Sequence, residues 1–257
     1  MKSFRNQAPR PKKNRLVVGR EAVIKALETG VALERIYLQA TVHGPVIDTI
    51  KQLAADRLVP INKVPVEKLN FFNVHNHEGC VAMIARVQYQ DLQQIIDMVV
   101  EQGKAPLIIM LDGITDVRNV GGIARSAYAM GVDALVIPER GIAALNDDAL
   151  LTSAGALEHL PVCRVGNLVK AVEDLKLNGI KVFATEMKAS NDIASCDFTI
   201  PSAIVLGGEE KGIQPALLQV CDAQCRIPMT GSFDSLNVSV SAGIVLYEVL
   251  KQRQTTR

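Results

Sequence analysis

The stretch that decides the fold, residues 204–241, reads IVLGGEEKGI, a connector long enough for one helix, and CRIPMTGSFDSLNVSVS. The pattern predicts an apolar strand, a glycine-rich turn, a helix, a second strand over residues 224–228, a polar loop and a final amphipathic helix. Two strands therefore each end in a loop rich in glycine, serine and asparagine. Because ligands of open α/β sheets bind at the carboxyl ends of strands, we expect the active site here.

The chain around this stretch alternates strands with helices. We expect strands at residues 107–112, 133–138, 161–165, 181–185 and at Ala203, and helices at about 119–130, around Ala149, from Asn167, and at 238–252. This alternation predicts an α/β fold, a parallel sheet with helices on both faces.

A smaller alternation of strands and helices comes before it. We expect helices at residues 16–28, 46–55 and 66–72 and strands at 34–39, 58–62 and 80–87. The expected organisation is a basic flexible tail (1–15), a small α/β domain (16–88), a linker helix (89–105) and the main domain (106–257).

Composition narrows the class of protein. The chain has 257 residues, 48% of them apolar, which is enough to bury a sizeable core. It has no apolar run of the length that a membrane span needs, and its basic N-terminus lacks the apolar core of a secretory signal. Its five cysteines are scattered and include no Cys-x-x-Cys pair, so they predict reduced thiols and not a disulfide framework or zinc site. We therefore expect a cytoplasmic protein with no membrane partner.

Charge is concentrated at the N-terminus. The first 20 residues hold seven of the 28 Lys and Arg residues and no acid, although the whole chain carries only +1. A basic arm of this kind commonly binds a polyanion. A solubility tail or a cloning remnant is the alternative.

A second stretch with chemical potential, LDGITDVRNVGGIARSAYAMG, spans residues 111–131. It follows a strand and begins a helix, where free backbone N–H groups favour an anion. Asn119 and Arg125 are six residues apart and so lie on different faces of a helix, and we expect the preceding loop to present Asn119. The stretch has no Gly-x-Gly-x-x-Gly, and the chain has no P-loop, which argues against a dinucleotide enzyme. Arg125 alone could equally be a solvated surface residue.

Three segments together carry a family resemblance: NVGGIARSA (119–127), LGGEEKGI (206–213) and IPMTGSFDSLNVS (227–239). They resemble the three ordered motifs of the SpoU/TrmH RNA 2′-O-methyltransferases of the SPOUT superfamily. Residues 14–88 resemble the RNA substrate-binding domain of these enzymes, and the layout is most similar to the branch that modifies a guanosine of large-subunit ribosomal RNA. The chain departs from the family pattern at Glu78, where glutamine is usual, and at Glu210, where a small residue is frequent.

The resemblance implies a C-terminal trefoil knot, a homodimer, and S-adenosyl-methionine as the cofactor, with no metal. It places the cofactor against Gly207, Ile227, Met229 and Leu236. Glycine lets the backbone approach the ligand closely, so we expect a larger residue at position 207 to fill the cofactor's space and leave the fold intact.

For catalysis the resemblance points to Arg125, with Asn119, Glu209, Ser235 and Asn237 positioning the ribose and the methyl donor. A guanidinium stays protonated in proteins, so we expect Arg125 to bind the target phosphate and stabilise the alkoxide, and not to act as a base. Glu209 could also serve as a helix N-terminal carboxylate, and Ser235 and Asn237 as the cap of the last helix. Capping and catalysis are compatible.

Other interpretations remain. The substrate could be transfer RNA, with ribosomal RNA favoured, or the chain could be a non-catalytic RNA-binding factor in ribosome assembly. A scaffold would not need the polar set Asn119, Arg125, Glu209 and Asn237, so an enzyme is preferred. His75, His77 and Cys80 lack a fourth metal ligand. Ser153 lies in a Ser-Ala-Gly-Ala run, which is typical of helix packing and not of a nucleophile elbow.

Overall fold

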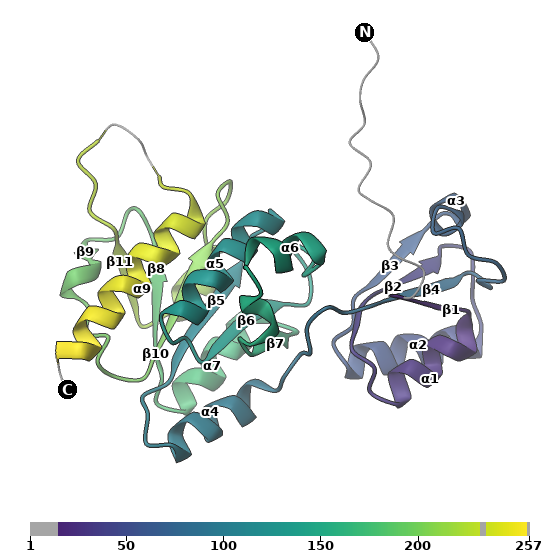
Figure 1. The fold of residues 1–257 in the computed structure, drawn as a ribbon, viewed down its shortest axis with the longest axis horizontal. Helices are drawn as coiled ribbons and strands as arrows, with labels where there is room; N and C mark the ends of the chain where they lie inside the picture. Colours follow the sequence, from purple (N-terminus) through teal and green to yellow (C-terminus); the bar gives the residue numbers. More distant parts are fainter. Residues whose placement is uncertain (1–14, 232–234, 256–257) are drawn as a thin grey trace, which may run out of the picture. The chain divides into compact units, whose positions relative to one another are not determined.

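A computed structural model of the chain describes residues 15–231 and 235–255. The chain divides into two compact units, Met1–Ala85 and Arg86–Arg257 (Figure 1). The division comes three residues before the expected boundary at residue 88. The basic tail expected at residues 1–15 lies outside the described residues except for Arg15.

The first unit is a four-stranded sheet with helices. Its elements are β1 (Leu16–Val18), α1 (Arg20–Glu28), β2 (Leu33–Gln39), α2 (Pro45–Asp56), β3 (Ile61–Val64), α3 (Val66–Asn70) and β4 (Cys80–Ile84). The strand order is β1-β4-β2-β3, in which β2 and β3 are parallel and β4 is antiparallel to both of its neighbours. Buried residues of α1 and α2, among them Val23 and Ile50, pack on Ile36 and Leu38 of β2.

The expectation of one helix over residues 16–28 was wrong at its start. Leu16, Val17 and Val18 form a strand paired with β4, and the helix begins only at Arg20. Gly19 separates the two elements with a φ of 92°, a conformation that β-branched or bulky residues avoid. The two valines also favour a pleated strand over a helix.

The second unit is an α/β domain with a seven-stranded sheet. Its elements are α4 (Leu92–Glu101), β5 (Leu107–Asp112), α5 (Val117–Ala129), β6 (Ala134–Pro138), α6 (Asp147–Thr152), η2 (Ala156–Glu158), β7 (Val162–Val165), α7 (Leu168–Leu177), β8 (Lys181–Thr185), β9 (Asn191–Asp192), η3 (Ile193–Ser195), β10 (Ser202–Gly207), α8 (Pro215–Val220), β11 (Ala223–Arg226) and α9 (Val238–Thr255). The strand order is β7-β6-β5-β10-β8-β11-β9, and every pairing is parallel.

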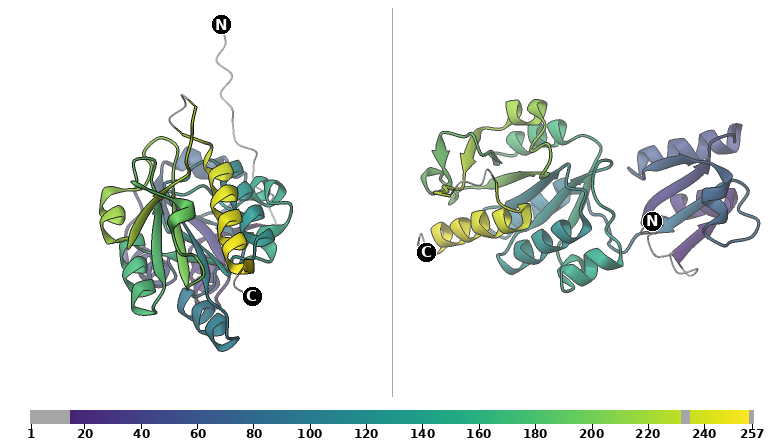
Figure 2. Two further views of the ribbon diagram at one scale, coloured as in Figure 1. Left: turned by 90° about the vertical axis from the view of Figure 1, so that its left-hand side faces the viewer. Right: turned by 90° about the horizontal axis from the view of Figure 1, so that it is seen from above.

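Helices cover both faces of this sheet, as expected from the alternation (Figure 2). Successive residues of β5 point to opposite faces: Ile109 packs in the core under α5 and α9, whereas Ile108 packs in the core under α4 and α7. Ile95 and Ile96 of α4 belong to that second core, so the helix expected as a linker is an integral part of this domain.

Helices α5 and α9 lie side by side because small residues line their contact. A Cβ atom added at Gly122 of α5 would lie 3.1 Å from the Cβ of Ser239, and one at Gly243 of α9 would lie 3.9 Å from the Oγ of Ser126. At the other end of α9, the Arg253 guanidinium donates four hydrogen bonds to backbone carbonyl oxygens, at 2.8–3.1 Å. The acceptors are Ala105, Pro106, Phe198 and Ile200.

Further details differ from the sequence prediction: β3 covers Ile61–Val64 and not 58–62, and β4 ends at Ile84 and not at residue 87. Helix α5 begins at Val117 and not near Asn119, because the Asp116 carboxylate accepts a hydrogen bond from the Arg118 N–H (2.8 Å) and caps the helix there. The two-residue edge strand β9 was not predicted. Among the described helices, none is both long and apolar enough to cross a membrane.

Candidate active site

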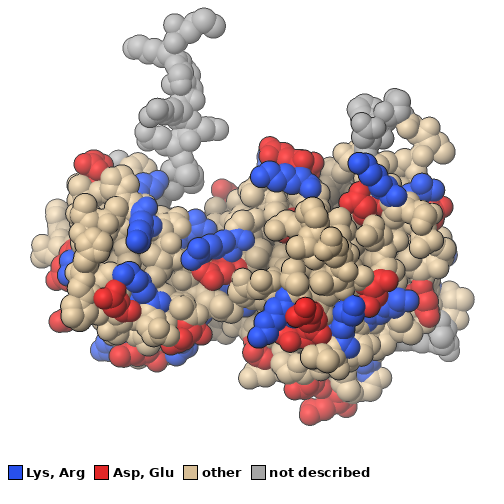
Figure 3. All heavy atoms as spheres, turned by 180° about the vertical axis from the view of Figure 1, so that it is seen from behind, with Lys and Arg blue, Asp and Glu red and all other residues tan. Residues whose placement is uncertain are grey.

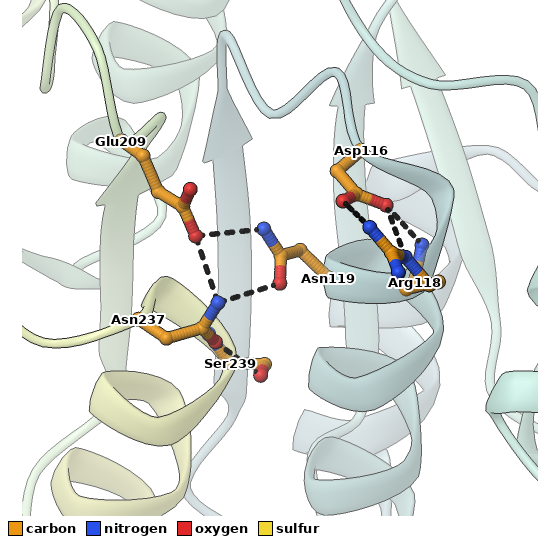
Figure 4. A network of polar contacts seen from close by, with 6 residues as sticks. All are labelled: Asp116, Arg118, Asn119, Glu209, Asn237 and Ser239. Atoms are coloured by element: carbon orange, nitrogen blue, oxygen red, sulfur yellow. Dashed lines mark hydrogen bonds and ion pairs between the residues drawn. The ribbon is translucent and has the colours of Figure 1, made fainter.

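Three polar side chains, one from each of the three motifs, meet beyond the end of β10 (Figure 4). Asn119 Nδ2 donates a hydrogen bond to Glu209 Oε1 (2.9 Å). Asn237 Nδ2 donates to the same carboxylate oxygen (2.8 Å) and to Asn119 Oδ1 (3.0 Å). Asn119 is 9% exposed, so these partners satisfy a side chain that water barely reaches. The three residues, here called the polar trio, come from three segments far apart in the sequence.

The helices explain how two of these residues are held. Asn119 is the third residue of α5 and is buried, so the helix itself presents it, and the expectation that the preceding loop would do so was wrong. Asn237 precedes α9, and its Oδ1 accepts hydrogen bonds from the backbone N–H (2.9 Å) and the hydroxyl (2.6 Å) of Ser239. Asn237 thus caps α9 while its amide group binds the trio.

The trio leaves hydrogen-bonding capacity unused. Both N–H groups of Asn237 are engaged, but Asn119 Nδ2 uses one of its two. Glu209 accepts both bonds at Oε1, and no other partner of its carboxylate occurs among the described residues. One amide donor and one carboxylate oxygen are therefore available to a hydroxyl-bearing ligand.

A cavity of about 160 Å³ lies beside the trio and brings together most of the predicted residues. This first cavity is lined by all four residues expected to hold the cofactor, Gly207, Ile227, Met229 and Leu236, and by Glu209 and Ser235. Residues 232–234 of the third motif lie outside the described residues. One cavity is therefore lined by the end of β10 (206–209), the end of β11 and the residues after it (225–229), and the residues before α9 (235–236).

The glycines at the end of β10 are required by a close passage of the backbone. A Cβ atom at Gly207 would lie 2.3 Å from the carbonyl carbon of Gly212, and one at Gly208 would lie 2.3 Å from the oxygen of Gly113. Real Cβ atoms do not approach other atoms this closely. The expectation that a larger residue at position 207 would leave the fold intact was therefore wrong, because the backbone of the following turn occupies the space.

A second cavity, of about 670 Å³, is also lined by residues of that turn. It shares Glu209, Gly212 and Val238 with the first cavity and is also lined by Asn119. The remaining lining residues are Asp112, Gly113, Ile114, Thr115, Asp116, Gly141, Glu210, Lys211 and Gln214. The two cavities thus adjoin at Glu209, Gly212 and Val238.

Arg125 is the one predicted site residue that lies apart. It is exposed on α5, lines neither cavity, and has no hydrogen bond or ion pair within the described residues. Asn119 lies about 9 Å away along the helix axis, at 1.5 Å per residue, and on a different face. One copy of the chain therefore does not bring Arg125 to the polar trio.

Sequence reasoning missed residues at the end of β8 and directly after it. Thr185, Glu186 and Met187 line the first cavity from the carboxyl end of that strand. The rule that ligands bind at carboxyl ends of parallel strands would have found them, because β8 neighbours β10 in the sheet. No motif marks them, and the order of strands could not be read from the sequence.

The buried carboxylate of Asp112 has a structural role at the same edge. It accepts hydrogen bonds from the backbone N–H (2.7 Å) and the side-chain amide (2.8 Å) of Gln214, which fix the start of α8 against the end of β5. At the nearby start of α5, the Arg118 guanidinium holds the pKa of the Asp116 carboxyl below its ordinary value. Both partners of that pair are exposed, so its contribution to stability is small.

Three of the five cysteines, Cys80, Cys163 and Cys225, are buried. Cys225 lines the first cavity, and burial raises its pKa to about 12, so it remains a neutral thiol at physiological pH. The His77 ring accepts a hydrogen bond from Gly79 N–H at Nδ1 and contacts Asn70 at Nε2, and burial raises the pKa of Cys80 to about 12. Within residues 15–231 and 235–255, no group of three or more His, Cys, Asp or Glu side chains is arranged to hold a metal ion.

Comparison with protein families gives two matches. Residues 106–247 match the model of the SpoU rRNA Methylase family, and residues 16–90 match the model described as RNA 2′-O ribose methyltransferase substrate binding. Each match covers most of one of the two units.

Curated relatives extend over nearly the whole chain. A protein of Staphylococcus aureus strain MSSA476, named for the TrmH family of tRNA/rRNA methyltransferases, is 37% identical over 93% of this chain and 96% of its own length. YacO of Bacillus subtilis strain 168, named for the same family, is 36% identical over 92% and 95%. Among solved structures, the SpoU methyltransferase AviRb of Streptomyces viridochromogenes, in complex with the cofactor AdoMet, matches with a TM-score of 0.59 and 26% identity over 94% of this chain and 91% of its own.

Proposed function

This chain belongs to the SpoU rRNA methylase family, and we propose that it transfers a methyl group from S-adenosyl-methionine to a ribose 2′-hydroxyl of RNA. The observation that carries the proposal is the polar trio, whose Glu209 lines the first cavity and whose Asn119 N–H and Glu209 carboxylate each have one hydrogen-bonding position unused among the described residues. Donor and acceptor groups at this spacing suit the hydroxyls of a ribose.

The residues of the first cavity fit S-adenosyl-methionine. Leu206, Ile227 and Leu236 provide apolar walls for an adenine ring, and the ends of β10 and β11 provide backbone polar groups at its edge. The cavity of about 160 Å³ is smaller than the roughly 300–1,000 Å³ of pockets that bury drug-sized ligands.

The protein's part in the reaction is positioning and charge stabilisation. When bound, S-adenosyl-methionine would supply an electrophilic methyl group to the 2′-oxygen and would leave as the neutral thioether, while the hydroxyl proton would pass to water. Asn119 donates to the ribose oxygen, Glu209 accepts from a ribose hydroxyl, and Asn237 fixes both of them. Ser235, on the cavity wall, helps to orient the methyl donor.

We further propose that the active form is a homodimer in which Arg125 of a second copy reaches the polar trio. Within one copy Arg125 is exposed and remote from both cavities, although its family resemblance marks it as catalytic. Apolar side chains on α5, which carries Arg125, and on the adjacent α9 are also exposed: Tyr128 (50%), Val240 (50%) and Tyr247 (61%). Burial of such aromatic groups commonly drives association. We also propose the C-terminal trefoil knot that the resemblance implies.

The RNA itself is proposed to be large-subunit ribosomal RNA, modified at a guanosine, with transfer RNA as the alternative. The match of the first unit to a substrate-binding model supports an RNA partner for that unit. Figure 3 shows basic and acidic side chains interspersed over the face drawn, so charge there does not mark the RNA-binding surface. The free, shielded thiols suit the reducing cytoplasm.

Mass-spectrometric mapping of ribose methylation in RNA from cells with and without the gene tests the proposal. We expect one 2′-O-methylated nucleotide to disappear from ribosomal RNA when the gene is deleted, and to return with the parental gene. Loss from transfer RNA would favour the alternative substrate. Unchanged methylation in both RNAs would favour a non-catalytic role in ribosome assembly and contradict the enzyme.

A further inference from the structure

Glu209 of the polar trio lines both cavities, and Asn119 lines the second one. This arrangement indicates what the second cavity binds. Methyl transfer needs donor and acceptor on opposite sides of one reacting point. If the first cavity holds the methyl donor, the acceptor nucleoside must approach Glu209 and Asn119 from the side of the second cavity. We infer that the second cavity receives the target nucleoside, turned out of the RNA, and that the Glu210 carboxylate selects guanine. This inference rests on the proposed function.

The size and charge of the cavity fit a nucleoside and disfavour a phosphate. Its volume of about 670 Å³ lies within the roughly 300–1,000 Å³ of small-molecule sites. Four carboxylates line it, those of Asp112, Asp116, Glu209 and Glu210, against the single cation of Lys211. Carboxylates repel phosphate and accept hydrogen bonds from N–H and O–H groups. The base and ribose therefore enter, and the backbone phosphates remain outside.

Hydrogen bonding leaves one of these carboxylates free to read a base. Both oxygens of Asp112 accept from Gln214. Both oxygens of Asp116 accept from Arg118. Glu209 binds the two asparagines of the trio. Glu210 is exposed, and among the residues that the structure describes it has no hydrogen-bond or ion-pair partner.

A free carboxylate offers two parallel acceptors, and guanine is the base that matches them. Its Watson–Crick edge presents two adjacent donors, N1–H and N2–H, whereas the same edge of adenine, cytosine or uracil has a single donor position. Lys211, the next residue, has an ammonium group that can donate to the guanine O6. The adjacent pair thus complements the whole Watson–Crick edge of guanine.

Nucleoside titration of the isotopically labelled full chain tests the assignment without requiring catalysis. With S-adenosyl-homocysteine present, guanosine should shift the amide resonances of Thr115 and Lys211, two residues of the second cavity. Inosine, which lacks N2–H, should bind several-fold more weakly, and adenosine more weakly still. Glu210→Gln should weaken guanosine binding by about tenfold or more, the scale of losing a hydrogen bond to a charged group. Glu173→Gln, an exposed change on α7, should bind guanosine like the parent.

Equal binding of adenosine and guanosine, parental affinity in Glu210→Gln, or shifts confined to other residues would each overturn the inference. RNA mapping separates it from the proposed function. If the parent methylates the ribose of a nucleotide other than guanosine, the function stands and the selection by Glu210 fails. If no RNA is methylated but guanosine binds in a manner that depends on Glu210, the function fails and the cavity assignment stands.

Discussion

At the scale of single residues, Asn237 combines two roles that a pair of substitutions can separate. Its Oδ1 caps α9, and its amide N–H groups bind Asn119 and Glu209. Asn237→Ser keeps a capping oxygen and loses the amide donors, whereas Asn237→Ala loses both. We expect the free energy of unfolding of Asn237→Ala to be about 1 kcal/mol lower than that of Asn237→Ser, because an N-cap usually contributes this much.

Methyl transfer should fall equally in the two Asn237 variants, because neither retains the donors to the trio. Thermal denaturation and single-turnover transfer, measured side by side, check this. Near-parental activity in Asn237→Ser would mean that Asn237 acts only as a cap.

Arg125 poses a different question, because one copy of the chain does not bring it to the trio. We expect Arg125→Lys and Arg125→Ala to lower single-turnover transfer by roughly a hundredfold or more, since lysine lacks the planar fork of donors. Cofactor affinity and melting temperature should stay near parental, because Arg125 has no partner in the described structure.

Mixing the Arg125→Ala and Asn237→Ala chains tests whether Arg125 acts across a dimer. Random re-association should restore about a quarter of parental activity, because half of the dimers are mixed and each has one intact site. If both site residues act within one chain, the mixture will stay inactive.

At the scale of elements, the turn after β10 depends on the absence of side chains. Gly208→Ala would place a Cβ 2.3 Å from the oxygen of Gly113, and we expect a loss of about 1–3 kcal/mol in the free energy of unfolding, the range for overpacked sites. Gly231→Ala is the matched control, because a Cβ there meets no atom of the described residues within 4 Å. Chemical denaturation compares the two. Parental stability in Gly208→Ala would show that the passage is looser than described.

Elements with a strong local signal could be predicted from the sequence. The apolar run 107–112 is β5, and Asn167 caps α7 as expected. The predictions that failed concern elements that depend on pairing with strands distant in the sequence: residues 16–18 form a strand because they pair with β4, and β9 pairs with β11. The site divides in the same way. The motifs located the trio and the first cavity, but the place of Thr185 and the distance of Arg125 depend on strand order and helix phase.

At the scale of the whole molecule, three buried thiols should make stability fall at alkaline pH. Burial raises the pKa of Cys80, Cys163 and Cys225 from 9.0 to about 12. In the unfolded chain these thiols ionise from about pH 9, while in the folded protein they stay protonated. Their contribution is complete below pH 9 and is lost between pH 9 and 12.

We expect the free energy of unfolding to drop in that window by up to about 1.4 kcal/mol per pH unit for each thiol. Denaturant titrations at pH 8, 9.5 and 10.5 check this, with Cys163→Ala as the comparison. The slope should be shallower in that variant. An identical slope would assign the alkaline loss to other groups.

The pairing of β5 with β10 also determines the order in which the two units can fold during synthesis on the ribosome. The strands of the first unit end at Ile84, so that unit has its whole sheet early in synthesis. Strand β5 must wait for residues 202–207, and the carbonyl groups of Ala105 and Pro106 wait for Arg253. At about 5–20 residues per second, translation from Ile84 to the C-terminus takes roughly 10–35 s. For that interval a nascent chain carries a finished first unit ahead of an incomplete second one, in which β5 still lacks its neighbour β10.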